Sequence, residues 1–147
     1  MFCKYCMLDI AEGMTVCPHC GKDLTQIQPP HRLSPGTVLN GKYLVGAALG
    51  EGGFGVTYVG KNLLLDVKVA IKEYFPNGYV RRDVSVSTNV TGVSASGYSQ
   101  VFEAGKKRFL SEARTLARFL SEDGIVSVFD FFEENGTAYI VMEYLEG

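Results

Sequence analysis

The chain of 147 residues lacks the features that would place it in a membrane or on nucleic acid. No apolar run approaches the roughly 20 residues that span a bilayer, so no transmembrane segment is expected. Lysine and arginine total 14 against 16 acidic residues, and the net charge of −2 gives no attraction for nucleic acid or anionic lipid. The N-terminus has no basic stretch followed by an apolar one, which predicts no secretory signal and a cytoplasmic location.

Cysteine is absent after residue 20. The four cysteines form two C-x-x-C pairs, Cys3 with Cys6 and Cys17 with Cys20. Four thiolates at this spacing are typical of a tetrahedral Zn²⁺ site, which can order a segment too short for a hydrophobic core. Two disulfides would need an oxidising compartment, and a redox C-x-x-C would sit in a βαβ unit. Residues 1–22 are therefore predicted to form a small zinc ribbon.

Residues 23–39 are polar and contain three of the five prolines of the chain, Pro29, Pro30 and Pro35. This composition predicts a semi-extended linker. His31 is isolated within it, so we expect a solvated histidine rather than a catalytic one.

After the linker, two β-favouring runs enclose a glycine-rich turn, Gly50-Glu51-Gly52-Gly53-Phe54-Gly55. Glycine lets a backbone lie close to a phosphate chain, where a Cβ would hold it away. Dinucleotide-binding folds use the same spacing, but there the glycines open a helix. The run Val56–Val59 favours a strand, so the glycines are predicted to lie at the tip of a hairpin.

The next strand is predicted at Val69-Ala70-Ile71-Lys72, ending near Pro76. Side chains alternate along a strand, which places Ala70 and Lys72 on one face. A methyl group leaves room for a flat base, while the ammonium can reach onward to phosphates. This face is therefore a candidate nucleotide site.

Residues 100–120 carry the clearest helical pattern, with Phe109, Ala113, Leu116 and Leu120 on one face. Glu112 borders this apolar stripe, so one arrangement places its carboxylate beside the buried face of the helix. In the alternative arrangement Glu112 is exposed and pairs with Arg108 one turn back. Glu103 is a reserve candidate for the acid of this helix. The preceding region, 79–99, fits either a small hairpin or a loop, and no chemistry is assigned to it.

The last predicted elements are strands at 125–132 and 137–144. Asn135-Gly136 lies between them, and this dipeptide between two apolar runs is among the strongest hairpin signals.

Together these motifs resemble the amino-terminal lobe of protein kinases, in particular bacterial serine/threonine kinases of eukaryotic type. The resemblance is carried by the strings G-E-G-G-F-G-V-T-Y, V-A-I-K-E-Y-F-P, F-L-S-E-A-R-T-L-A-R-F and Y-I-V-M-E-Y-L-E-G. It implies an α+β fold over residues 40–147, a five-stranded antiparallel sheet with one long helix, preceded by the zinc ribbon. ATP and Mg²⁺ are the implied cofactors, and the implied partner is a protein substrate.

The resemblance also implies roles for individual residues. Lys72 would hold the α- and β-phosphates, and Glu112 would pair with Lys72 to orient it. Met142 would flank the base, while the C=O of Glu143 and the N–H of Leu145 would bond the adenine edge. The implied nucleotide-binding residues are Leu49, Gly50, Glu51, Gly52, Gly53, Phe54, Gly55, Thr57, Ala70, Lys72, Met142, Glu143 and Leu145. Thr57 stands where these kinases usually have valine.

The chain contains neither an H-R-D-x-x-x-x-N motif nor D-F-G, which supply the catalytic base and the Mg²⁺ ligands in protein kinases. We therefore expect the ATP-binding portion of a kinase, inactive alone and binding ATP weakly or not at all. In a longer protein it would serve transfer of the γ-phosphoryl group to serine or threonine. The alternative is a non-catalytic interaction or regulatory module.

Overall fold

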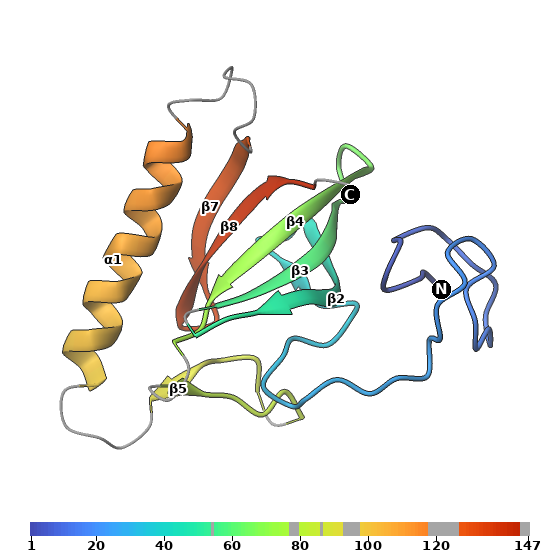
Figure 1. The fold of residues 1–147 in the computed structure, drawn as a ribbon, viewed down its shortest axis with the longest axis horizontal. Coiled ribbons are helices and arrows are strands. Elements are labelled where there is room, and N and C mark those ends of the chain that lie inside the picture. Colours follow the sequence, from blue (N-terminus) through green and yellow to red (C-terminus); the bar gives the residue numbers. More distant parts are fainter. Residues whose placement is uncertain (54, 77–79, 86, 93–97, 118–126, 145–147) are drawn as a thin grey trace.

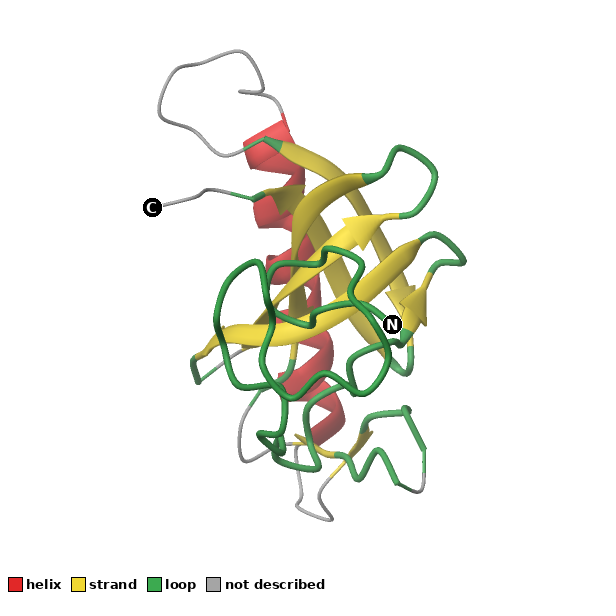
Figure 2. Cartoon of the chain, turned by 90° about the vertical axis from the view of Figure 1, so that its right-hand side faces the viewer, coloured by secondary structure: helices red, strands yellow, loops and turns green. Residues whose placement is uncertain are grey.

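The structure, a computed structural model, describes residues 1–53, 55–76, 80–85, 87–92, 98–117 and 127–144. A curled antiparallel sheet lies at its centre (Figure 1). Helix α1 flanks one side of this sheet, and the cysteine segment lies on the opposite side of the molecule (Figures 1 and 2). Among the described residues, no helix combines the length and apolar character needed to cross a membrane.

The main sheet contains the five predicted strands and one short additional strand. Its spatial order is β1-β2-β3-β4-β8-β7, and every neighbouring pair is antiparallel. The strands are β1 (Val38–Leu39), β2 (Tyr43–Glu51), β3 (Gly55–Asn62), β4 (Val67–Tyr74), β7 (Val128–Glu134) and β8 (Thr137–Glu143). The two-residue β1 belongs to the segment predicted as linker, and it was too short to give a periodic signal.

The β7–β8 connection confirms the predicted hairpin. Asn135 and Gly136 both have positive φ, 55° and 72°, which is the combination that a tight two-residue hairpin turn requires. The carbonyl of Asn135 also accepts a hydrogen bond from the N–H of Val90 (2.8 Å). The turn therefore joins the region 79–99 to the main sheet.

Region 79–99 contains a two-stranded sheet, formed by β5 (Val80–Arg81) and β6 (Thr91–Gly92). Of the two predicted alternatives, the described part of this region thus contains the small hairpin. Helix α1 (Tyr98–Ala117) follows and agrees closely with the predicted helix. It buries Phe102, Phe109 and Ala113 against the lobe; the side chain of Leu116 and residue Leu120 lie outside what the structure describes.

The cysteine segment is held together by two isolated bridges, Phe2 with Asp9 and Val16 with Asp23. It packs on β2 at Gly46, where a Cβ would lie 2.5 Å from the carbonyl oxygen of Lys4 and 2.6 Å from the sulfur of Met7. A register shift in β2 follows Val45, and the N–H of Ala47 donates to that same Lys4 carbonyl (2.7 Å). Glycine at position 46 therefore allows the cysteine segment to touch the strand.

The segment after the cysteines differs from the semi-extended linker predicted. Leu33 is fully buried and belongs to the core of the lobe. His31 is half-buried and hydrogen-bonded, so the expectation of a solvated histidine was wrong. Sequence composition gave no sign of either contact, because both partners lie far away in the chain.

Candidate functional site

Strand β4 positions the residues predicted to face a nucleotide. Lys72 is paired with Thr57 on β3 and with Ile140 on β8, while Ala70 is paired with Met142. Directly paired residues of antiparallel strands share a face. Lys72, Ala70, Thr57 and Met142 therefore lie on one face of the sheet, as the sequence predicted.

A cavity of about 310 Å³ opens between β4 and α1 on this face. Its lining residues are Lys72, Tyr74, Gly105, Arg108, Phe109 and Glu112. Lys72 and Glu112, the two predicted catalytic residues, thus reach the same space from the sheet and from the helix. The ammonium of Lys72 lies 5.9 Å from the centre of the Phe109 ring.

The predicted Lys72–Glu112 ion pair is not formed in this arrangement. Among the described residues, no carboxylate lies within 4.0 Å of the Lys72 ammonium. Nor does the structure contain the alternative pair of Glu112 with Arg108, although Arg108 lines the same cavity. The reserve candidate Glu103 is paired instead with Lys106, at 3.4 Å.

The glycine-rich turn connects β2 to β3, as predicted, and a strand follows Gly55 rather than a helix. A Cβ built at Gly50, Gly52 or Gly53 would meet no atom within 4 Å. At Gly55, by contrast, it would lie 2.6 Å from the carbonyl oxygen of Glu73. Packing within the protein therefore requires glycine at position 55 but not at the other three.

The remaining predicted nucleotide-binding residues are only partly described. Leu49 is 51% exposed near the end of β2, and Met142 and Glu143 are half-buried at the end of β8. The N–H of Glu143 donates to the carbonyl of Ser127 (2.8 Å). Phe54 and Leu145 lie outside the described residues, so their predicted roles remain predictions.

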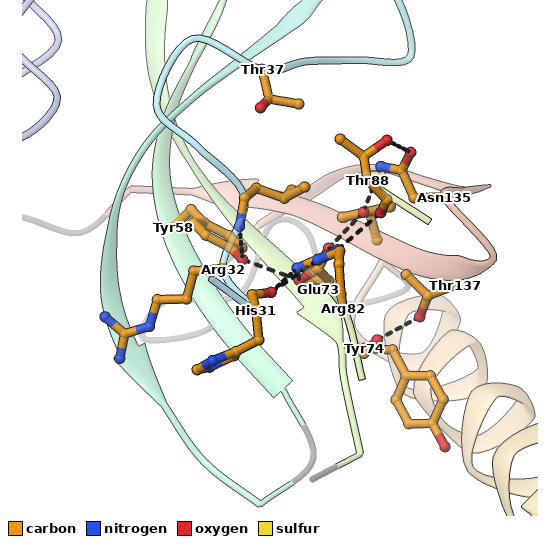
Figure 3. Close-up of polar contacts among 12 residues, drawn as sticks. His31, Arg32, Thr37, Tyr58, Glu73, Tyr74, Arg82, Thr88, Asn135 and Thr137 are labelled. Carbon is orange, nitrogen blue, oxygen red and sulfur yellow. Dashed lines mark hydrogen bonds and ion pairs between the residues drawn. The ribbon is translucent and has the colours of Figure 1, made fainter. Parts of the chain in front are cut away.

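The opposite face of β4 carries a buried ion pair that the sequence analysis missed. Glu73 and Arg82 have fully buried side chains and form two parallel bonds of 2.7 Å (Figure 3). The carboxylate also accepts hydrogen bonds from Tyr58 (3.1 Å) and Tyr139 (2.6 Å). Burial, together with the charge of Glu73, raises the pKa of both phenols, which keeps them protonated as donors.

One signal for this pair was present in the sequence. By strand alternation Glu73 shares its face with the buried Val69 and Ile71. A carboxylate on such a face requires a partner, because an unpaired buried charge is very costly. The identity of that partner, Arg82, was not predictable, because it lies in the region without a periodic pattern.

The four cysteines form a compact cluster, with all Sγ atoms within 4.8 Å of one another. The Sγ atoms of Cys3 and Cys20 are 3.7 Å apart, as are those of Cys6 and Cys17, so neither pair is a disulfide. Backbone N–H groups point at Cys17: those of His19 and Cys20 lie 3.3 and 3.5 Å from its sulfur. Burial raises the pKa of the Cys17 thiol, but hydrogen bonds from these N–H groups and from the thiols of Cys3 and Cys20 outweigh burial and lower this pKa to about 6.

No model of a known protein family matches the chain. It is 34% identical over 120 residues to the DNA damage-responsive serine/threonine-protein kinase RqkA of Deinococcus radiodurans, an alignment covering 78% of this chain and 14% of RqkA. It is 31% identical over 112 residues to serine/threonine-protein kinase PrkC of Bacillus subtilis, covering 76% and 14%. The chain thus spans only a small part of these relatives.

A solved structure, PpkA-294 in its apo form, superimposes with a TM-score of 0.72 and 37% sequence identity. The match covers 80% of this chain and 40% of the solved one. Within its described residues, the chain has a curled antiparallel sheet and one α-helix. In sequence and in fold the chain is thus homologous to bacterial serine/threonine protein kinases, and its sheet and helix are those of their amino-terminal lobe.

Proposed function

We propose that the lobe binds ATP and that, within a longer protein, it forms the ATP-binding half of a serine/threonine protein kinase. The reaction would be transfer of the ATP γ-phosphoryl group to a protein serine or threonine. One observation carries the proposal: Lys72 faces a cavity with no carboxylate within 4.0 Å among the described residues, on the same sheet face as Ala70 and Thr57. A cation in this position is available to a phosphate.

The glycine-rich turn supports the same proposal. Because nothing in the described protein fills the space beside Gly50, Gly52 and Gly53, a ligand can approach their backbone closely. Thr57, Ala70 and Met142 would then contact the flat base, and the main chain of Glu143 and Leu145 would bond its edge. Lys72 would hold the α- and β-phosphates.

Glu112 has a positioning role in this proposal. It lines the cavity from α1 without touching Lys72, so it can steady the ammonium only after the two groups approach each other. Mg²⁺ would arrive with ATP and neutralise its phosphates. No Mg²⁺ ligand is assigned to this chain.

A titration of the 147-residue chain with MgATP, followed by amide NMR shifts, tests nucleotide binding. We expect weak binding that perturbs residues 50–55 and 70–72. Lys72→Met should abolish these shifts, while Lys68→Met, on the same face of β4 but stacked on Tyr144, should leave them intact. Shifts that persist in Lys72→Met, or none at the glycine-rich turn, would overturn the proposal.

We also propose that the cysteine cluster binds one Zn²⁺. A tetrahedral Zn²⁺ with four bonds of about 2.3 Å places its sulfurs about 3.8 Å apart, close to the two 3.7 Å separations here. The ion would supply the cohesion that so short a segment cannot obtain from a hydrophobic core. Reduced thiolates of this kind fit a cytoplasmic protein.

Elemental analysis under reducing conditions should find one zinc per chain. Substituting Co²⁺ should give the intense absorption of sulfur-to-metal charge transfer, and Cys6→Ser should weaken both signals. His19→Ala is the matched control, since His19 is outside the four-sulfur cluster. A cysteine segment that stays folded without metal would contradict this proposal.

A further inference from the structure

The segment between the cysteine cluster and the sheet touches the glycine-rich turn directly. Glu51, the last residue of β2, has its Oε1 atom 2.6 Å from Nε2 of His31 and 3.1 Å from Nε of Arg32. All three side chains are 27–30% exposed, so water screens the contact only in part. Burial raises the pKa of Glu51, but the bonds from His31 and Arg32 outweigh it and keep that pKa below its usual value.

Residues 31–33 are fixed from the other side by the buried ion pair. The carbonyl of His31 accepts bonds from Nε (2.9 Å) and Nη2 (2.6 Å) of Arg82, as Figure 3 shows. The N–H of Leu33 donates to the Tyr58 hydroxyl (3.0 Å), and the Leu33 side chain is fully buried. These residues are therefore a rigid support rather than a loose tether.

The glycine-rich turn has little packing of its own. A Cβ added at Gly50, Gly52 or Gly53 would meet no atom within 4 Å, and a backbone bond from the Gly52 N–H to the Gly55 carbonyl (2.9 Å) closes the turn. Among the described residues of the turn, Glu51 is the one that forms ion pairs. Beyond the pairing of Gly50 and Glu51 with β3, the described side-chain contacts that hold the turn are therefore those of Glu51.

We propose that Glu51 is a positioning residue of the nucleotide site. His31 and Arg32 hold its side chain, and the segment to which they belong thereby fixes the position of the glycine-rich turn over the site. The proposal rests on the proposed ATP site. The guanidinium of Arg32 also offsets the negative charge of Glu51, which would otherwise repel the phosphates beneath the turn. The segment that leads from the cysteine cluster is thus part of the framework of the nucleotide site.

Amide hydrogen exchange of the nucleotide-free 147-residue chain, sampled from milliseconds onward, tests the positioning step without ATP. Glu51→Gln and the double variant His31→Ala/Arg32→Ala should each speed exchange at residues 50–55 by about two- to fivefold, the size expected for a partly exposed ion pair. Combining all three changes should add nothing, because one interaction is being removed. Arg32→Lys should retain part of the protection.

Asp66→Asn is the matched control, because it opens the Lys61–Asp66 pair (2.6 Å) elsewhere on the sheet. It should leave exchange at residues 50–55 unchanged. The MgATP titration is then repeated on each variant. His31→Ala/Arg32→Ala should weaken ATP binding about two- to fivefold, while global unfolding by urea shifts little.

The two proposals fail in different ways. If ATP perturbs neither the turn nor Lys72 while the exchange results hold, the ATP site is wrong and Glu51 only orders a loop. If ATP binds but exchange at residues 50–55 is the same in Glu51→Gln and in the unaltered chain, the positioning role is overturned. Additive effects of the three substitutions would overturn it as well.

Discussion

Lys72 and Glu73 are neighbours on β4, but their side chains lie on opposite faces of the strand and differ in burial and in charged partners. Glu73 is fully buried and receives four hydrogen bonds, from Arg82, Tyr58 and Tyr139. Lys72 faces a cavity, with no carboxylate within 4.0 Å among the described residues. A buried charge must be compensated within the protein, whereas a half-exposed charge is stabilised by water and needs no partner before a ligand binds. The contrast separates a charge that holds the fold from one that is free to bind.

The glycines divide in the same way. Gly46 and Gly55 lie where a Cβ would collide with backbone atoms. Gly50, Gly52 and Gly53 have open space beside them. The first group is required by packing, whereas the second leaves room for the proposed nucleotide.

The largest expected effect follows from breaking the buried pair. Arg82→Ala or Glu73→Ala leaves one buried charge without its partner, which should lower the free energy of unfolding by about 3–5 kcal/mol. Urea denaturation measures this change. Replacing both residues at once, by Glu73→Leu and Arg82→Met, should recover only part of the loss, because the hydroxyls of Tyr58 and Tyr139 would lose their acceptor. Asp66→Asn, which breaks an exposed pair, should lower the free energy of unfolding by less than about 1 kcal/mol. If it costs as much as Arg82→Ala, the buried pair has no special role in holding the fold.

The second effect compares two glycines. Gly46→Ala should destabilise the chain by about 1–3 kcal/mol, because the new methyl group meets the Lys4 carbonyl and the Met7 sulfur. Gly52→Ala should change the free energy of unfolding by no more than about 0.5 kcal/mol. Denaturation curves of the two variants give the comparison. A Gly52→Ala cost as large as that of Gly46→Ala would remove the argument for a ligand at the turn.

The third prediction is that one substitution leaves the stability of the chain unchanged. Lys72→Met should leave the free energy of unfolding within about 0.5 kcal/mol of the unaltered chain, since no described carboxylate loses a partner. The ATP-dependent amide shifts should nevertheless disappear. Calorimetric unfolding and the titration are measured on the same sample. Strong destabilisation by this substitution would make Lys72 a structural residue.

The smallest effect concerns pH. The pKa of Glu51 is lower in the folded chain than its usual 4.5, so its carboxylate stabilises the fold above about pH 4.5 and loses that contribution as pH falls through the lowered value. The groups facing it are His31 and Arg32. The stability difference between the unaltered chain and Glu51→Gln should therefore shrink on acidification from about pH 6 to about pH 3. A difference that stays constant over this range would show that the carboxylate charge is not involved.

Local patterns were enough to predict most of the lobe. Strand alternation placed Ala70 and Lys72 on one face, Asn135-Gly136 marked a hairpin, and the helical stripe brought Glu112 to the side of Lys72. Each of these signals arises within a few residues, where periodicity and turn chemistry act. The predicted contact between Lys72 and Glu112 is not formed, because the final approach of a helix to a sheet depends on packing that no local pattern encodes.

The features that were missed are contacts between distant segments. Leu33 enters the core, His31 meets Glu51 twenty residues away, and Arg82 joins Glu73. Residues 23–39 and 79–99 have weak periodicity, so composition suggested loops. One further clue was available at Gly46, since glycine inside a strand often marks the close approach of another backbone.

The contacts along β2 also cover an edge of the main sheet. Beyond the short β1, the outward N–H of Val45 is bonded to Thr37 and that of Ala47 to Lys4. An uncovered strand of this kind is a template for pairing with another chain. A shortened chain that begins at Asn40 would expose this edge, and we expect it to self-associate through strand addition more readily than the 147-residue chain.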